Sequence, residues 1–393
     1  MLAAIYEDID QHFAEMVEIR RYLHQHPELS FKEFNTAQYI SDFYKKIGIP
    51  VESKVGGNGV IATLKGKLPG KTIALRADFD ALPIQDAKDV PYKSKVDGVM
   101  HACGHDAHTA SLLVLAKIMQ KHVDKLEGSI VFLHQHAEEL PPGGAKSIVQ
   151  SGMLSEVDAV FGNHFWSTLP VGTIGTKEDV FMAGADRFTI TIRGKGGHGA
   201  YPEETKDAVV IGAELITKLQ TIISRKVSPI DTGVLTIGQF QAGTAFNIIA
   251  DEAKLQGTIR YLKPEVKETM KAELFRIIHG VCEMNDADCD IDYQDGYPPL
   301  VNHPNETEII FEVAKEIEDV TNVLHSPVQL AAEDFAYYTE YTKGAFFFTG
   351  AHKVGHDHPH HHPMFDIDER AMPIAAKTLI GAYFACQAQG KEE

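Results

Sequence analysis

The sequence has few cysteines, no long apolar run and no excess of basic residues. Four cysteines in 393 residues do not form the disulfide framework of a secreted domain, so we expect a reducing, cytoplasmic setting. No stretch approaches the ~18 consecutive apolar residues of a membrane-spanning helix, so we expect no membrane partner. The formal net charge of -18 disfavours nucleic-acid partners, which bind basic surfaces.

The N-terminal segment lacks the basic and apolar regions of a signal peptide, so we expect it to belong to the mature protein. From about Glu7 to His24, apolar residues recur at helical spacing and predict one surface helix, which Pro27 ends. A second helix is predicted from Thr36 to Ile47.

Strands and helices alternate after these two helices, which predicts an α/β fold with a mostly parallel, mixed sheet flanked by helices. Ligands of such sheets bind beyond the carboxyl ends of the strands. The predicted strands cover residues 60–64, 72–78, 129–134, 159–162 and 345–349, and the predicted helices begin near 109, 145, 305 and 369.

The pattern changes between residues 184 and 297, where the order of elements is β-α-β-β-α-β. This order predicts an inserted α+β domain of ferredoxin-like type. The chain length also exceeds the usual size of one core, so we expect two domains. The first domain is then discontinuous and comprises residues 1–183 and 298–393.

One stretch of eight residues, His101 to His108, contains three histidines, a cysteine and an aspartate. Cys103 and His105 are separated by one residue, so an extended or turning backbone can direct both side chains to one point. A thiolate and an imidazole suit a borderline divalent ion such as zinc, manganese or cobalt. The alternative is a histidine-rich helix cap beside a buried cysteine.

Further polar clusters lie where strands of the first domain are predicted to end. The clusters are Asp78 and Asp80, Glu138 and Glu139, His164, and the histidines at 356–362. Each has a simpler interpretation: the aspartates could cap a strand end, the glutamates could be a solvated pair, His164 could be a core histidine, and the late histidines could form a mobile loop. Their common position at one sheet edge favours a site.

The sequence resembles the metal-dependent aminoacylase and carboxypeptidase clan. Within it, the resemblance is to the branch of N-acyl-amino-acid amidohydrolases, hippurate hydrolases, N-acetyldiaminopimelate deacetylases and auxin-conjugate hydrolases. The matching motifs are Arg-Ala-Asp-Phe-Asp-Ala-Leu-Pro (76–83), His-Ala-Cys-Gly-His-Asp (101–106), Ala-Glu-Glu (137–139), Gly-Lys-Gly-Gly-His (194–198), Gly-Thr-Ile-Arg (257–260), Glu-Asp-Phe (333–335) and His-His-Pro-Met-Phe (361–365).

The resemblance implies a fold of the di-metal exopeptidase type and two bound divalent metal ions. Manganese or zinc is expected, with cobalt and nickel as alternatives, and sulfur favours zinc. Among the late histidines, His361 is chosen because the family ligand lies two residues before the proline of His-x-Pro. The implied ligands are Cys103, His105, Glu139, His164 and His361.

The resemblance also assigns catalytic roles. Glu138 would be the general base, and Asp78 and Asp80 would orient the metal ligands. The metal would lower the pKa of a water molecule from ~16 towards ~7, and Glu138 would accept its proton and pass it to the departing amine. The implied reaction is hydrolysis of the amide bond of N-acyl, for example N-acetyl, amino acids.

The inserted domain is implied to act as a lid and a dimerisation domain. His198 would come from the partner subunit and stabilise the oxyanion, which requires at least a homodimer. Asn247 and Arg260 would hold the substrate carboxylate. The simpler interpretations are a glycine-rich turn at His198 and a surface charge at Arg260.

Two other functions stay open on the sequence. A dipeptidase or aminopeptidase of the same clan would require a free α-amino group on its substrate. A non-catalytic protein that stores or delivers metal would bind metal tightly without hydrolysis that depends on Glu138.

Overall fold

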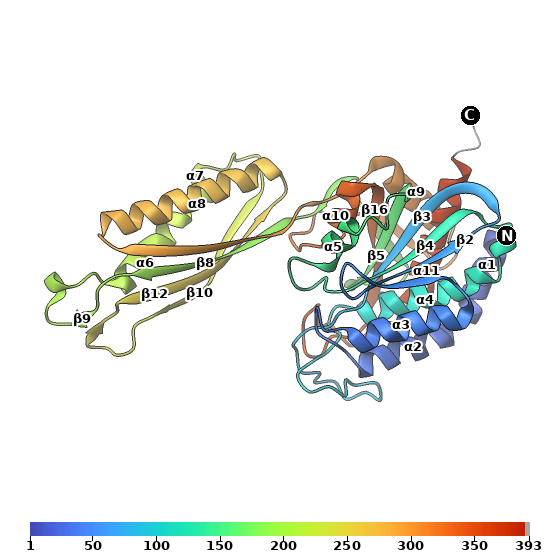
Figure 1. Ribbon diagram of the computed structural model, residues 1–393, viewed down its shortest axis with the longest axis horizontal. Coiled ribbons are helices and arrows are strands. Elements are labelled where there is room, and N and C mark those ends of the chain that lie inside the picture. The colour runs from blue at the N-terminus through green and yellow to red at the C-terminus, as the bar shows by residue number, and fades with distance from the viewer. Residues whose placement is uncertain (390–393) are drawn as a thin grey trace. The chain divides into compact units, whose positions relative to one another are not determined.

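The computed structural model describes residues 1–389, which form two compact units (Figure 1). The first unit comprises Met1–Phe181, Val301–Val328 and the part of the chain from Asp334 onward. The second unit comprises Met182–Leu300 and Gln329–Glu333. Two short strands, β7 (Asp179–Met182) and β14 (Leu300–Asn302), lie where the chain passes between the units.

The first unit is built on an eight-stranded mixed sheet with the strand order β1-β2-β4-β3-β5-β16-β6-β15. The four central strands β4, β3, β5 and β16 are parallel, whereas β1, β2 and β6 pair with a neighbour in the antiparallel sense. The predicted fold class is therefore confirmed. The strands are β1 (Val51–Val55), β2 (Gly59–Lys65), β3 (Leu68–Asp78), β4 (Glu127–Gln135), β5 (Ala159–Pro170), β6 (Thr173–Thr176), β15 (Asn322–His325) and β16 (Lys343–His352).

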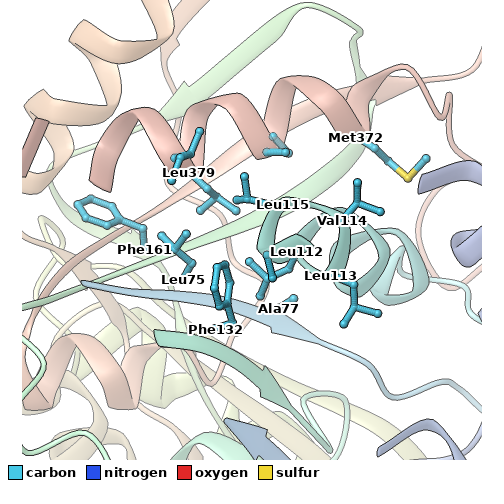
Figure 2. Close-up of a cluster of buried hydrophobic side chains, with 14 of the residues drawn as sticks. Leu75, Ala77, Leu112, Leu113, Val114, Leu115, Phe132, Phe161, Met372 and Leu379 are labelled. Atoms are coloured by element: carbon cyan, nitrogen blue, oxygen red, sulfur yellow. The ribbon is translucent and has the colours of Figure 1, made fainter. Parts of the chain in front are cut away.

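A continuous apolar core lies between this sheet and the helices α4 and α11. Figure 2 shows Leu75 of β3 and Phe132 of β4 near Leu112 of α4 and Leu379 of α11, and all four side chains are buried. The helices of the unit are α1 (Leu2–Gln11), α2 (Phe13–Gln25), α3 (Phe34–Ile47), α4 (His105–Gln120), α5 (Gly144–Gln150), α9 (Pro304–Lys315), α10 (Ala336–Tyr341) and α11 (Ala371–Ala388).

The single helix predicted from Glu7 to His24 is wrong, because the structure has two helices that meet at His12. The His12 backbone has φ -97° and ψ 9°, and its ring Nδ1 lies 2.7 Å from the carbonyl oxygen of Asp8. A side chain that bonds a backbone carbonyl competes with the regular helical pattern.

Among the described residues, no helix is both long and apolar enough to span a membrane.

The second unit contains a four-stranded antiparallel sheet with the order β10-β12-β8-β13. Burial alternates along β12, because one face of the sheet packs on α6 and α8 while the other is exposed. The order of elements is the predicted β-α-β-β-α-β. They are β8 (Gly184–Arg193), β9 (Gly197–His198), α6 (Ala208–Leu219), α7 (Thr221–Arg225), β10 (Gly233–Ala242), β11 (Ile248–Ile249), β12 (Glu252–Tyr261), α8 (Pro264–Met284) and β13 (Asp288–Tyr297).

Candidate metal centre

Polar side chains converge at the carboxyl ends of the central strands of the first unit. Asp78 is the last residue of β3, and Glu138 and Glu139 follow the end of β4. His164 lies within β5, which is longer than the strand predicted to end at residue 162. Helix α4 begins at His105, and its N-terminus lies beside these strand ends.

Gly104 separates Cys103 from His105 and caps α4 in the left-handed conformation, with φ 97°. Glycine adopts this conformation without steric cost, because it has no Cβ. The cysteine therefore precedes a sharp turn while the histidine starts the helix, and both side chains reach the same place. The Sγ atom of Cys103 lies 3.3 Å from Nε2 of His164.

The structure brings the five candidate metal ligands together in two overlapping groups. Cys103, His105 and His164 form one group, and Cys103, Glu139 and His361 form the other. The ligand atoms within each group all lie within 4.8 Å of one another. Since Cys103 belongs to both groups, these five residues could together hold two divalent ions.

The hydrogen bonds of the histidines leave the correct nitrogen atoms available for metal. His105 directs Nδ1 at Asp80, 3.1 Å from Oδ1, so its Nε2 is buried without a hydrogen-bond partner. His164 donates from Nδ1 to the Phe165 carbonyl oxygen at 2.8 Å, which leaves the lone pair of Nε2 facing Cys103. Histidine ligands in metal sites are oriented in this way by a bond from the other ring nitrogen.

The electrostatics of the site show a shortage of positive charge. Burial disfavours the imidazolium of His105, but Asp78, Asp80 and Glu139 outweigh it and raise the pKa of His105 to about 10. Burial, together with the carboxylates of Glu139, Glu138 and Asp78, holds the pKa of the Cys103 thiol well above its usual value. A divalent cation would supply the missing charge and displace both protons. The residues therefore fit a metal centre.

The two strand-end aspartates have different partners. Besides His105, Asp80 accepts hydrogen bonds from the hydroxyl of Ser30 at 2.7 Å and from the backbone nitrogen of Glu139 at 3.0 Å. Asp78 instead lies between the guanidinium of Arg76 and Nδ1 of His108, 2.6 Å away. Asp80 thus orients two candidate ligands directly, whereas Asp78 belongs to a network beside them.

His108 ends the histidine-rich stretch that the sequence analysis singled out, but no role was predicted for it. Its Nδ1 faces Asp78, and its Nε2 accepts a hydrogen bond from the backbone nitrogen of Phe165 at 3.0 Å. Because both ring nitrogens are engaged, His108 supports the site and leaves metal binding to others. Its position three residues after His105, on the same face of α4, was a signal that could have found it.

The adjacent residues Glu138 and Glu139 each place a carboxylate oxygen 3.9 Å from Nε2 of His105. Glu139 Oε1 lies 3.2 Å from Nε2 of His361. Glu138 is 7% exposed, and its Oε2 lies 3.9 Å from Nε2 of His105. A Glu138 oxygen lies within 4.8 Å of ligand atoms of His105 and Glu139, which belong to different groups.

The late histidine cluster contributes two residues to this site. The backbone nitrogen of His361 donates to the carbonyl oxygen of Ala102 at 2.8 Å, which holds the late loop beside Cys103. His360, which the sequence did not single out, places Nδ1 3.9 Å from the Cys103 sulfur. Its ring packs against Trp166, with centroids 5.0 Å apart.

The three candidate substrate-binding residues belong to the second unit. His198 pairs with Ile248 in the short β9–β11 ribbon, and the carbonyl oxygen of Asn247 accepts a hydrogen bond from Gly199. Arg260 lies near the end of β12, is half-buried, and has its pKa lowered by burial. His198 and Asn247 are thus neighbours at the surface, and Arg260 is on a separate strand.

Known proteins resemble this chain over most of its length. The model of peptidase family M20/M25/M40 matches residues 74–383. The Bacillus subtilis protein YhaA is 51% identical over 380 residues, which cover 96% of each chain. An N-acyl-L-amino acid amidohydrolase of Geobacillus stearothermophilus is 45% identical over 295 residues, which cover 75% of this chain and 80% of the relative.

A solved structure resembles most of this chain. It is the crystal structure of Bacillus subtilis YxeP, described as a dinuclear metal-binding peptidase of the M20 family. The TM-score is 0.82 and the sequence identity is 33%, over 96% of this chain and 99% of YxeP.

Proposed function

The chain belongs to peptidase family M20/M25/M40 and is a metal-dependent amidohydrolase, and from this premise we propose how its residues act on an N-acyl amino acid. The proposed reaction is cleavage of the amide bond into a carboxylic acid and a free amino acid. The observation that supports it best is the pair of overlapping ligand groups that share Cys103, with Glu138 beside them. The named activity of the Geobacillus relative supports the substrate class.

In this proposal, Cys103, His105, Glu139, His164 and His361 hold two metal ions. When bound, the ions lower the pKa of water from ~16 towards ~7 and polarise the amide carbonyl. Glu138 is the general base, because its carboxylate lies close to the ligand atoms and is not needed to complete either group around Cys103. It accepts a proton from the attacking water and then donates that proton to the departing amine.

The supporting residues keep this arrangement in place. Asp80 orients His105 through Nδ1 and holds the backbone of Glu139, so one carboxylate fixes two ligands. Asp78 is proposed to act less directly, by holding His108 and through it the backbone of Phe165, next to the ligand His164.

We further propose that the metals are manganese or zinc, with cobalt or nickel as substitutes. The sulfur ligand favours zinc, because thiolates prefer softer ions. The cysteines of the described chain are all free, which supports a reducing, cytoplasmic setting.

The substrate carboxylate is proposed to bind Arg260 and Asn247, and His198 of a second copy is proposed to stabilise the oxyanion. The working form is then at least a homodimer that associates through the second unit. The β9–β11 ribbon supports this, because Phe246 and Ile248 are exposed apolar side chains next to Asn247.

The test is hydrolysis of a panel of N-acetyl amino acids by the protein loaded with manganese or with zinc. We expect turnover of several members and none of dipeptides that carry a free α-amino group. Turnover only of the free dipeptides would favour a peptidase of the same family. A metal-loaded protein that is inert on every amide in the panel would contradict the proposed function.

A further inference from the structure

One buried carboxylate outside both ligand groups contacts the residue that precedes the general base. Glu33 lies immediately before α3 and has no exposed surface. We infer that Glu33 is a positioning residue that holds the turn carrying Glu138 and Glu139 in its working conformation. This inference rests on the proposed function, since it concerns the direction of the proposed base.

The Glu33 carboxylate accepts hydrogen bonds from two backbone nitrogens and one side-chain amide. Its Oε1 accepts hydrogen bonds from the backbone nitrogens of Ala137 and Phe31, each at 2.9 Å. Its Oε2 accepts from the side-chain amide of Asn58, also at 2.9 Å. The bond to Ala137 joins residues 104 positions apart, so it connects the N-terminal loop to the turn after β4.

Ala137 needs such a contact because its backbone is in an unfavourable conformation. Its φ is 52°, in the left-handed region that residues with a Cβ rarely adopt. Backbone strain of this kind persists only where the surroundings impose it, and it is common at active sites. Since Ala137 directly precedes Glu138, a return to a relaxed φ would point the base in another direction.

The same turn is held at its other end by Asp80, which accepts the backbone nitrogen of Glu139 at 3.0 Å. Asp80 is itself tied to Ser30 in the loop before α3. The loop containing Ser30 and Glu33 therefore supports both ends of the turn. Only the Glu33 end acts on the strained residue, while Glu139 keeps its own contact with Asp80.

This division of contacts predicts a specific kinetic effect. Without the Glu33 carboxylate, Glu138 should lose its direction while Glu139 stays anchored. For Glu33→Ala we expect kcat to fall by about 10- to 100-fold, as for loss of other supporting partners in metal sites. We expect KM and the number of bound metal ions to stay close to those of wild type.

Two variants separate positioning from ordinary loss of stability. Glu33→Gln keeps an acceptor for Ala137, and the Asn58 amide can turn to accept from the new amide group, so we expect kcat near wild type. In the second variant, Ala137→Gly is added to Glu33→Ala. Glycine adopts a positive φ without strain, so we expect this double variant to recover most of the lost kcat.

Glu28 provides a matched control in the same loop. Its carboxylate accepts hydrogen bonds from the backbone nitrogens of Asn35 and Thr36 at the start of α3, away from the turn. Glu28→Ala should therefore lower stability without changing kcat. Wild-type kcat in a folded Glu33→Ala variant would overturn the inference, and so would equal losses of kcat in Glu28→Ala and Glu33→Ala.

The remaining outcomes of these experiments also support or overturn the proposed role of Glu33. If Glu33→Ala does not fold, the double variant with Ala137→Gly is measured alone: turnover supports the inference, and a folded but inactive protein overturns it. Wild-type enzyme is assayed first on N-acetyl amino acids. Absence of that activity is a failure of the proposed function, whereas an active wild type with insensitive Glu33 variants is a failure of this inference only.

Discussion

The two units differ in how many charged side chains they bury. In the first unit, Arg20 is fully buried and reaches three carboxylates, with Asp106 at 2.9 Å, Asp366 at 3.0 Å and Glu369 at 3.2 Å. Among residues 182–300, which the structure describes completely, Asp186 is the one buried charged side chain. The second unit also includes Glu333, so it buries two charged side chains, Asp186 and Glu333, beside an otherwise apolar core.

The difference indicates which segments of the first unit must be held in fixed positions. Burying ions costs free energy that is recovered only with good geometry, so a buried network is a poor way to gain stability alone. Arg20 joins Asp106, next to the candidate ligand His105, to Asp366, which follows the loop of His361. Buried charge therefore connects the segments that carry metal ligands, as Glu33 does for the turn of the base.

The largest effect of a single substitution should come from Glu138→Gln in the first unit. Loss of a general base lowers turnover by about 10²–10⁴-fold, so we expect a fall of that size in kcat. Metal content, measured by atomic absorption, should stay at the wild-type level because Glu138 is not among the proposed ligands. A wild-type kcat in this variant would remove Glu138 from the mechanism.

The next largest effect should follow from Arg20→Ala. Removal of one partner from a buried charge network leaves unpaired charges and costs about 3–5 kcal/mol. We expect a loss of that order in urea unfolding followed by circular dichroism, together with weaker metal binding. A loss below about 1 kcal/mol, the size typical of exposed ion pairs, would show that the buried network is not held tightly.

A smaller effect should come from acid, through the buried His134 of β4. Burial lowers the pKa of His134 from 6.5 to about 3, and its ring lies between Tyr44 and Thr109. Between these pKa values the unfolded chain binds a proton that the native state does not. Stability should therefore fall as pH drops from 6.5, by up to about 1.4 kcal/mol per pH unit from this group.

This pH dependence can be assigned with His134→Gln. The variant should show a shallower decline in unfolding free energy between about pH 6 and pH 4 than wild type. An unchanged slope would mean that His134 does not contribute, whatever the effect of the substitution at neutral pH.

The smallest effect is expected from Arg193→Ala in the second unit. Arg193 forms an ion pair with Asp290, and both side chains are more than half exposed. Solvent screens such pairs, so unfolding by urea should not distinguish the variant from wild type. A clear destabilisation would contradict the contrast drawn between the two units.

Many of the side chains predicted from the sequence lie together in the structure, and the reasons are local. The family resemblance, the amide-hydrolase function and the fold class are confirmed. The spacing of Cys103 and His105, and the polar residues after β3 and β4, are visible over a few positions. The break at His12 and the four-residue strands β6 and β15 were missed, because they are too short to produce a hydrophobic period.

The sequence alone specified the alternation of the longer strands and helices, the residue types available to hold metal, and the family of the chain. Only the tertiary structure decided that Asp80 serves His105 and Glu139 together, that His108 is occupied on both nitrogens, and that Glu33 reaches Ala137. Such contacts join segments far apart in the chain, so no periodicity or spacing encodes them. They arise when the packed sheet brings its strand ends and loops together.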